Sequence, residues 1–252
     1  MTDEAKEIAW DIINCGLDNA PDPNKDCNPL YASQSCNNAQ DFQIPEPWNG
    51  DIINAPILFV GLNPGFTSDE LYPKIGDPYW VQKPDTLDAS KVEDFFENRF
   101  NGVYVEHSNG QRFSIMTTSK QFRVLRGRTF WGYIKSIADK ILNTSNSNPG
   151  VDFAITEIVH CKSKNIACIP AKCYEECLNN HFDNILSIAQ NLKYIVIIGQ
   201  QARNRIAKHF SMTKPIYKYQ WYNQSLNNRS VKIIFVDHNA GGGSVKKIPT
   251  LP

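Results

Sequence analysis

Four short apolar segments of this chain are each followed by residues that can do chemistry. Along the chain they are PILFVG (56–61) before Leu62-Asn63-Pro64-Gly65, FAITEIV (153–159) before His160-Cys161, YIVIIG (194–199) before Gln200-Gln201, and VKIIFVD (231–237) before His238. The second segment also carries Glu157. An amide, a carboxylate and a histidine can all hydrogen-bond a polar ligand, and the last two can exchange protons with it. Asn63, Glu157 and His238 are therefore candidate site residues.

The four apolar segments have the composition of buried β-strands. Near-continuous apolar runs with little alternation indicate strands covered on both faces, which is typical of a parallel sheet. Helical patterns lie before and between them, at about residues 5–13, 91–100, 128–142, 172–190 and 200–210. The first of these helices leads to Cys15. The alternation predicts an α/β fold, a three-layer sandwich around a central, mainly parallel four-stranded sheet.

The residues after the four strands should meet at one edge of the sheet. In open parallel sheets, ligands bind beyond the carboxyl ends of the strands. The glycine-containing turn at 61–65 and the glycines at 241–243 could let backbone N–H groups approach an anion such as phosphate. Each feature also has a simpler interpretation. The turn at 61–65 could be an ordinary tight turn, the glycines at 241–243 a loose loop, and His238 a structural histidine.

Length and composition limit the class of protein. We expect 252 residues to form a single domain, with an N-terminal helix and cysteine-containing loop extension at 1–50 and an irregular insertion at 67–127. Lys plus Arg and Asp plus Glu both number 26, so a nucleic-acid partner would need a local basic patch. The apolar runs are too short to cross a bilayer, and the N-terminus is unlike a secretory signal, so we expect a cytoplasmic protein. No nucleotide-triphosphate loop, HExxH zinc motif or GxSxG elbow is present.

The seven cysteines fall into two groups. They are Cys15, Cys27 and Cys36 near the N-terminus and Cys161, Cys168, Cys173 and Cys177 in one later stretch. An odd number of cysteines without a secretory signal argues against a disulfide framework. The fold could bring both groups to one thiolate-bound metal site, or most of them could be small buried side chains.

Taken together, the motifs resemble the uracil-DNA glycosylase superfamily. GLNPGF (61–66) is similar to the GINPG or GMNPG motif of the mismatch-specific and single-strand-selective branches. ITEIVHC (155–161) resembles the TNVVKC-like strand of the iron-sulfur branches, where a ligand cysteine follows 16 residues later, as Cys177 follows Cys161. NLKYIVIIGQQA (191–202) and the strand ending at His238 complete a resemblance that spans about residues 56–244.

The resemblance implies a uracil-DNA glycosylase-like fold and a DNA-repair enzyme. Such an enzyme hydrolyses the N-glycosidic bond of uracil, or of another deaminated or damaged base, flipped out of DNA. Asn63 corresponds to the residue that positions or activates the attacking water, and His238 to the histidine that hydrogen-bonds the departing base. The implied base-binding residues are Gly61, Leu62, Phe66, Glu157 and Tyr79, with Trp80 as a further aromatic candidate.

Two positions depart from the family pattern. Glu157 stands where the iron-sulfur relatives have the Asn that reads the uracil edge, and an ionised carboxylate can only accept hydrogen bonds. Glu157 could be protonated by burial, could read a base that presents two donors, or could act as a catalytic base. His238-Asn239-Ala240-Gly241 replaces an HPS-type motif. Without the proline, the backbone conformation of that loop is less restricted.

The iron-sulfur resemblance also implies a metal site. Its relatives carry a C-x-x-C pair near the N-terminus, whereas Asp18 stands three residues after Cys15. A longer loop could replace the pair, so the expected ligands of a [4Fe-4S] cluster are Cys15, Cys27, Cys161 and Cys177. Zinc is the alternative ion, because four thiolates also suit it. Cys168 and Cys173 are expected to be packing thiols.

A local basic cluster is the expected DNA contact. The DNA-binding candidates are Lys120, Arg123, Arg126 and Arg128, with Gly242, Ser244 and Lys246 after the last strand. Cations of this kind neutralise phosphates, although a solvated loop would look the same. We expect DNA as the partner, no membrane association, and a monomer.

Two rival functions share these residues. One is a catalytically altered member of the same fold that only binds nucleic acid. The other is a small-molecule enzyme acting on nucleosides, with His238 and Glu157 as an acid-base pair. Activity on damaged DNA, DNA binding without excision, and activity on free nucleosides separate the three.

Overall fold

The computed structural model describes most of the chain. The described residues are 1–19, 27–34, 41–66, 72–83, 86–100, 105–106, 112–113, 130–164, 169–212, 215–238 and 245–250.

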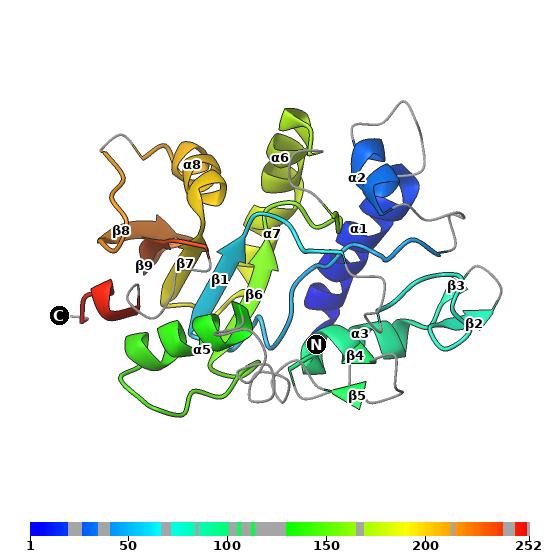
Figure 1. Ribbon diagram of the computed structural model, residues 1–252, viewed down its shortest axis with the longest axis horizontal. Coiled ribbons are helices and arrows are strands. Elements are labelled where there is room, and N and C mark those ends of the chain that lie inside the picture. The colour runs from blue at the N-terminus through cyan, green and yellow to red at the C-terminus, as the bar shows by residue number, and fades with distance from the viewer. Residues whose placement is uncertain are drawn as a thin grey trace.

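A mainly parallel five-stranded sheet forms the centre of the structure (Figure 1). In spatial order its strands are β6 (Phe153–Glu157), β1 (Ile57–Gly61), β7 (Tyr194–Ile198), β9 (Arg229–Val236) and β8 (Trp221–Leu226). The first four are mutually parallel, and β8 runs antiparallel to β9 at the edge. The α/β class and the mainly parallel sheet are confirmed, but the predicted number of four strands is wrong.

Strand β8 was not predicted from the sequence, because it is an edge strand. Its sequence, WYNQSL, alternates between half-buried and exposed positions and lacks a continuous apolar run. An edge strand with one wet face needs few apolar residues. A signal was nevertheless present, since Asn227 and Asn228 join β8 to β9 with φ of 48° and 62°. Two residues with positive φ are typical of a tight hairpin turn, and asparagine favours it.

The helices and short hairpins surround the sheet. The helical elements are α1 (Asp3–Asn19), α2 (Asn28–Ser33), α3 (Ala89–Asn98), α5 (Phe130–Ile141), α6 (Ala171–Cys177), the π-helical η3 (Leu178–Phe182), α7 (Asp183–Ile188), α8 (Gln200–His209) and the 3₁₀ turn η4 (Val245–Lys247). The hairpins pair β2 (Val81–Lys83) with β3 (Thr86–Leu87) and β4 (Val105–Glu106) with β5 (Arg112–Phe113). Figure 1 shows α1, α2, α3 and the β2–β3 hairpin gathered at the end of the sheet beyond β6.

Alternate strand residues pack on opposite faces of the sheet, which produces three layers. Leu58, Val60 and Ile195 belong to a core shared with α1, α6, α7 and α8. Ile57, Phe59 and Val196 belong to a second core with α5 on the other face. Both faces of the sheet are therefore covered and excluded from water, as the continuous apolar runs predicted.

The predicted helices are present, with two differences. The helix predicted at 172–190 is a continuous run of α6, η3 and α7, whose middle segment is π-helical. The N-terminal helix continues to Asn19, so Cys15 lies within it rather than at its end. Within the predicted irregular insertion, α3 and the two hairpins are ordered elements.

No helix of the described part of the chain is both long and apolar enough to span a membrane.

Candidate functional site

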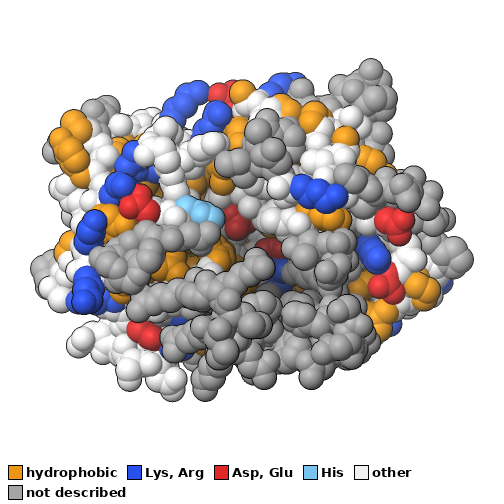
Figure 2. All heavy atoms as spheres, in the orientation of Figure 1, with side chains coloured by type: hydrophobic (Ala, Val, Ile, Leu, Met, Phe, Trp, Pro, Cys, Tyr) orange, Lys and Arg blue, Asp and Glu red, His pale blue; other side chains and the backbone are white. Residues whose placement is uncertain are grey.

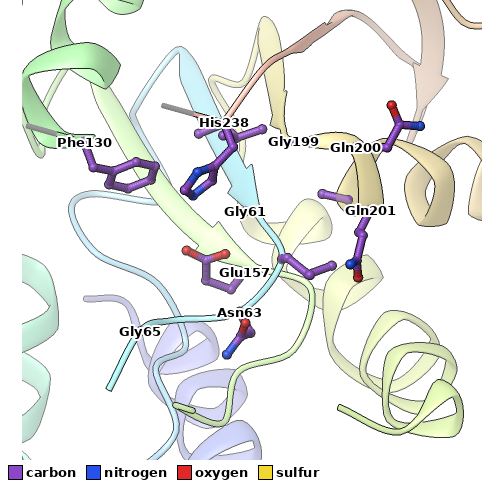
Figure 3. A pocket seen from close by; sticks show the side chains of 12 residues that line it. Gly61, Asn63, Gly65, Phe130, Glu157, Gly199, Gln200, Gln201 and His238 are labelled. Atoms are coloured by element: carbon purple, nitrogen blue, oxygen red, sulfur yellow. The ribbon is translucent and has the colours of Figure 1, made fainter. Parts of the chain in front are cut away.

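A pocket lies beyond the carboxyl ends of the parallel strands (Figure 3). Its volume is about 520 Å³, within the range of small-ligand sites. Its lining residues are Gly61, Leu62, Asn63, Gly65, Phe130, Glu157, Ile198, Gly199, Gln200, Gln201, Ala202 and His238. The structure thus brings together Asn63, Glu157 and His238, which come from three different strand ends. Figure 2 shows this face hollowed near its centre, with a histidine at the rim and acidic side chains beside it.

Strand register places Glu157 in the pocket floor. Gly61 and Glu157 are paired across β1 and β6 at the last position of each strand. A Cβ on Gly61 would lie only 1.9 Å from Glu157 Oε2, so glycine makes room for that carboxyl. At the neighbouring strand end, Gly199 has φ of +91°, which turns the chain directly from β7 into α8.

Asn63 is held by its amide nitrogen. Its Nδ2 donates to Ser163 Oγ at 2.7 Å and to the Pro64 carbonyl oxygen at 3.1 Å. Backbone bonds from Ser163 N to Pro64 O and from Phe66 N to Ser163 O join the two loops. Figure 3 shows the Asn63 oxygen on the side of Glu157. The amide therefore presents an acceptor to the pocket, and Ser163, which the sequence reasoning missed, orients it.

His238 stacks on an aromatic ring that was not predicted to line the site. The His238 and Phe130 ring centroids are 5.6 Å apart, with an angle of 26° between the planes. Partial burial lowers the pKa of His238 below its ordinary value, so the imidazole is neutral at neutral pH. The preceding residue, Asp237, accepts hydrogen bonds from Lys218 Nζ and Tyr219 Oη and fixes the strand end.

Glu157 is a buried carboxyl that no described residue binds. Its exposed fraction is 7%, and Oε2 has no hydrogen-bond partner among the described residues. Burial raises the pKa of Glu157 well above its ordinary value, and the negative charge of Glu46 raises it further. The charges of Lys162 and Arg99 oppose this rise, but the pKa stays high. Burial therefore favours the protonated, neutral form of Glu157.

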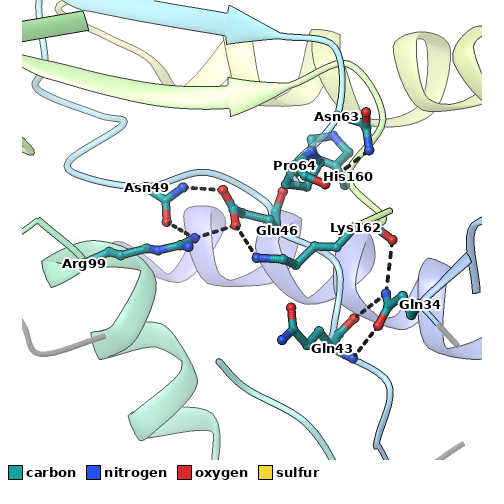
Figure 4. A network of polar contacts seen from close by, with 9 residues as sticks. All are labelled: Gln34, Gln43, Glu46, Asn49, Asn63, Pro64, Arg99, His160 and Lys162. Atoms are coloured by element: carbon teal, nitrogen blue, oxygen red, sulfur yellow. Dashed lines mark hydrogen bonds and ion pairs between the residues drawn. The ribbon is translucent and has the colours of Figure 1, made fainter. Parts of the chain in front are cut away.

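Glu46 is also buried, but its low pKa keeps it ionised. Its partners are Arg99, Asn49 and Lys162 (Figure 4). Burial alone would raise its pKa, yet the charges of Arg99 and Lys162 and hydrogen bonds from Arg99 and Asn49 lower that pKa to about 2. Asn49 Nδ2 donates to Glu46 Oε1 at 2.6 Å, Arg99 contacts Oε2, and Lys162 Nζ lies 3.7 Å from Oε2. The sequence reasoning did not identify this network.

A backbone pairing brings Glu46 to the site. Asn49 forms an antiparallel bridge with Ile155 of β6, and Glu46 N donates to the His160 carbonyl oxygen at 2.9 Å. His160 Nδ1 lies 2.9 Å from the Glu46 carbonyl oxygen. The extended segment 43–49 has no strand-like apolar pattern in the sequence, so its position depends on these long-range bonds.

Two of the expected base-binding aromatics lie away from the pocket. Phe66 is half-buried and packs under Lys164, whose Nζ is 5.2 Å from the ring centroid. Tyr79 is 57% exposed and packs edge-on against Trp80, which is buried beside α3. Neither Phe66, Tyr79 nor Trp80 lines the pocket. Phe130 lines the pocket instead.

Most of the expected DNA contacts lie outside the described residues. These are Lys120, Arg123, Arg126, Arg128, Gly242 and Ser244. Asn239, Ala240 and Gly241, which belong to the motif after the last strand, also lie outside the described residues. Lys246 is described and is exposed in η4.

The four cysteines expected to bind metal lie near one another. Cys15 is in α1, Cys27 precedes α2, Cys161 follows β6, and Cys177 ends α6. A hydrogen bond with Cys27, burial, and the charges of Cys27, Cys177 and Cys15 raise the pKa of Cys161. Burial and the charges of Cys27 and Cys15 likewise raise the pKa of Cys177.

The donor chemistry at this place, four cysteine thiols, suits a thiolate-bound metal. Within the described ranges, no group of three or more His, Cys, Asp or Glu side chains is arranged to hold a metal ion. Cys173, expected to be a packing thiol, lies with its Sγ 3.7 Å from Cys27 Sγ. Cys36 and Cys168 lie outside the described residues.

Comparison with known proteins identifies one family. The family model of the uracil DNA glycosylase superfamily matches residues 47–242. None of the curated proteins searched matches the chain.

Proposed function

This chain belongs to the uracil-DNA glycosylase superfamily, and from that premise we propose that it is a DNA-repair glycosylase. Family membership supports a DNA glycosylase function in general. The proposed reaction is hydrolysis of the bond between deoxyribose and a uracil or other deaminated base that has been flipped out of DNA. The observation that supports it most is the convergence of Asn63, Glu157 and His238 on one pocket of about 520 Å³.

Asn63 has the geometry to hold the attacking water. Because Ser163 Oγ and the Pro64 carbonyl accept from its Nδ2, its oxygen is the atom left to accept from water. A water oriented in this way can add its oxygen to C1′ as positive charge develops on the sugar. The water then loses a proton.

His238 has the position to stabilise the departing base. When the glycosidic bond breaks, its electron pair leaves with the base nitrogen, and the base becomes an anion. A neutral imidazole that donates a hydrogen bond to this anion stabilises the transition state more than the ground state. The base takes up a proton on release, so the overall reaction consumes one water. Stacking on Phe130 holds the imidazole plane in place.

We also propose that Cys15, Cys27, Cys161 and Cys177 hold the [4Fe-4S] cluster implied by the iron-sulfur resemblance, with zinc as the alternative. A bound cluster would supply a rigid cross-link between α1, the start of α2, and the segments around β6 and α6. No step of base excision depends on it.

Excision from defined oligonucleotides tests the proposed function. Wild-type protein is expected to leave alkali-labile abasic sites in strands that contain uracil, hypoxanthine or xanthine. Asn63→Ala and His238→Ala should each lower the single-turnover rate by about 100-fold or more. Asn223→Ala, on the exposed side of β8, is the matched control and should leave the rate unchanged.

The negative outcomes identify the rival functions. If the folded wild-type protein excises none of these bases but binds DNA with a steep salt dependence, it is a nucleic-acid-binding member of the fold. If it ignores DNA and cleaves free nucleosides, it is a small-molecule enzyme. Either result contradicts the proposed function.

A further inference from the structure

Glu157 lines the pocket, and no described residue binds either of its carboxyl oxygen atoms. No hydrogen bond or ion pair joins its carboxyl to the described protein, and Oε2 is fully enclosed. Buried polar groups in folded proteins almost always have a partner. Figure 3 shows the carboxyl between Asn63 on one side and His238 and Phe130 on the other. The missing partner is therefore expected to be part of the ligand.

The charged groups around Glu157 favour its neutral form. Arg99 and Lys162, the cations that act on it, both contact Glu46 instead. Glu46 remains ionised and repels a second negative charge. His238, on the far wall of the pocket, is neutral because burial lowers its pKa. No described cation pairs directly with the Glu157 carboxyl, so the charges of Lys162 and Arg99 only partly offset the cost of ionising it in this enclosed site.

We propose that Glu157 selects the base as a carboxylic acid, donating its O–H to a base carbonyl oxygen and accepting the adjacent ring N–H with its C=O. This inference rests on the proposed function and assigns its substrate class. Uracil and hypoxanthine carry such a lactam edge, with a carbonyl beside an N–H. A neutral carboxyl offers one donor and one acceptor, the same set as the Asn amide of the iron-sulfur relatives.

The chemistry of base loss also requires the neutral form. Negative charge spreads onto the base carbonyl oxygens as the glycosidic bond breaks. An O–H donor then becomes a stronger partner in the transition state, as in other sites where burial keeps an acid protonated. An ionised carboxylate would repel the same oxygen and raise the barrier. Glu157 keeps its proton throughout and is not consumed.

A pair of variants separates the acid from the carboxylate. Glu157→Gln cannot ionise but keeps one donor and one acceptor, and Glu157→Ala keeps neither. Single-turnover excision of uracil and of hypoxanthine is measured for both variants and the wild type between pH 6 and 10, with unfolding followed to confirm the fold. Glu4→Gln, on the exposed side of α1, is the matched control.

At neutral pH, Glu157→Gln should retain the rate to within about tenfold, and Glu157→Ala should lose about 100-fold or more. The wild-type rate should fall at alkaline pH as Glu157 loses its proton, and this loss should be smaller in Glu157→Gln. Because both act on the same substrate, ionisation of the base itself affects them equally. Infrared difference spectra at neutral pH should show a protonated carboxyl in the wild type that is absent from Glu157→Gln.

Two results would overturn the pairing in different ways. If the wild type excises bases but Glu157→Gln is as inactive as Glu157→Ala, the carboxylate is required, and the pairing is wrong while the glycosylase function stands. If the folded wild type excises no base at all, the proposed function and the pairing fail together.

Discussion

Glu46 and Glu157 are two carboxyl groups with similar burial and opposite shifts in pKa. Both are less than 8% exposed, and they lie close enough that the charge of one raises the pKa of the other. Glu46 is bound by Arg99, Lys162 and Asn49, whereas Glu157 has no described partner. Pairing keeps the first ionised, whereas burial without a described partner favours the protonated form of the second.

Replacing each carboxyl by an amide should change stability in opposite directions. The folded-state pKa of Glu46 is about 2, below its ordinary 4.5, so its stabilisation is present above pH 4.5 and is lost as the pH falls towards 2. Glu46→Gln removes the negative charge that Arg99 and Lys162 contact at this position. It should lower the free energy of unfolding by about 3–5 kcal/mol at pH 7. Glu157 has a raised pKa, so its contribution is present below pH 4.5 and is lost as the pH rises. Glu157→Gln should therefore raise stability at pH 7.

Denaturant unfolding between pH 3 and 9 measures both effects. The loss of stability on acidification from pH 4.5 should be smaller in Glu46→Gln than in the wild type. In the wild type, Glu157 should lower the free energy of unfolding as the pH rises from acid to neutral. This decrease should be absent from Glu157→Gln. Equal unfolding free energies for the two variants at pH 7 would contradict the assigned charge states.

At the level of elements, the sequence predicted what depends on continuous apolar patterns. The four buried parallel strands and the helices between them were found because both faces of those strands are dry. Strand β8 was missed because its wet face breaks the pattern, although Asn227-Asn228 marked the turn. The segment at 43–49 could not be predicted, because it is held beside β6 by long-range backbone bonds rather than by its own pattern.

The proposed cluster site joins elements that are far apart in the chain, which makes it testable without any activity. Purified protein should contain iron and sulfide and show visible thiolate-to-iron absorption. Cys161→Ser and Cys177→Ser should each lose most of the bound iron and lower the unfolding temperature, because the cross-link is lost. Cys173→Ser is the matched control and should retain the iron. Zinc in place of iron would support the alternative ion, and no bound metal in freshly purified protein would contradict the site.

For the molecule as a whole, the sequence predicted which residues at the strand ends form the site. It did not predict the site residues that come from other parts of the chain. Asn63, Glu157 and His238 could be placed at one edge because parallel strands end together. Phe130 and Ser163 could not, since the first comes from a helix on the other side of the sheet and the second from a loop paired with residues 64–66. The aromatic candidates Phe66 and Tyr79 were chosen by residue type, and only the fold distinguishes them from Phe130.

A structure of the protein with DNA that carries 2′-fluoro-2′-deoxyuridine tests the proposed site most directly, because the fluorine slows loss of the base. We predict that the nucleotide lies outside the double helix, with its uracil in the pocket between Asn63, Glu157 and His238. The Glu157 carboxyl should lie within hydrogen-bond distance of uracil O4 and N3, and Asn63 should hold a water about 3–3.5 Å from C1′. A uracil still stacked in the duplex, or bound away from these three residues, would contradict the site and the function built on it.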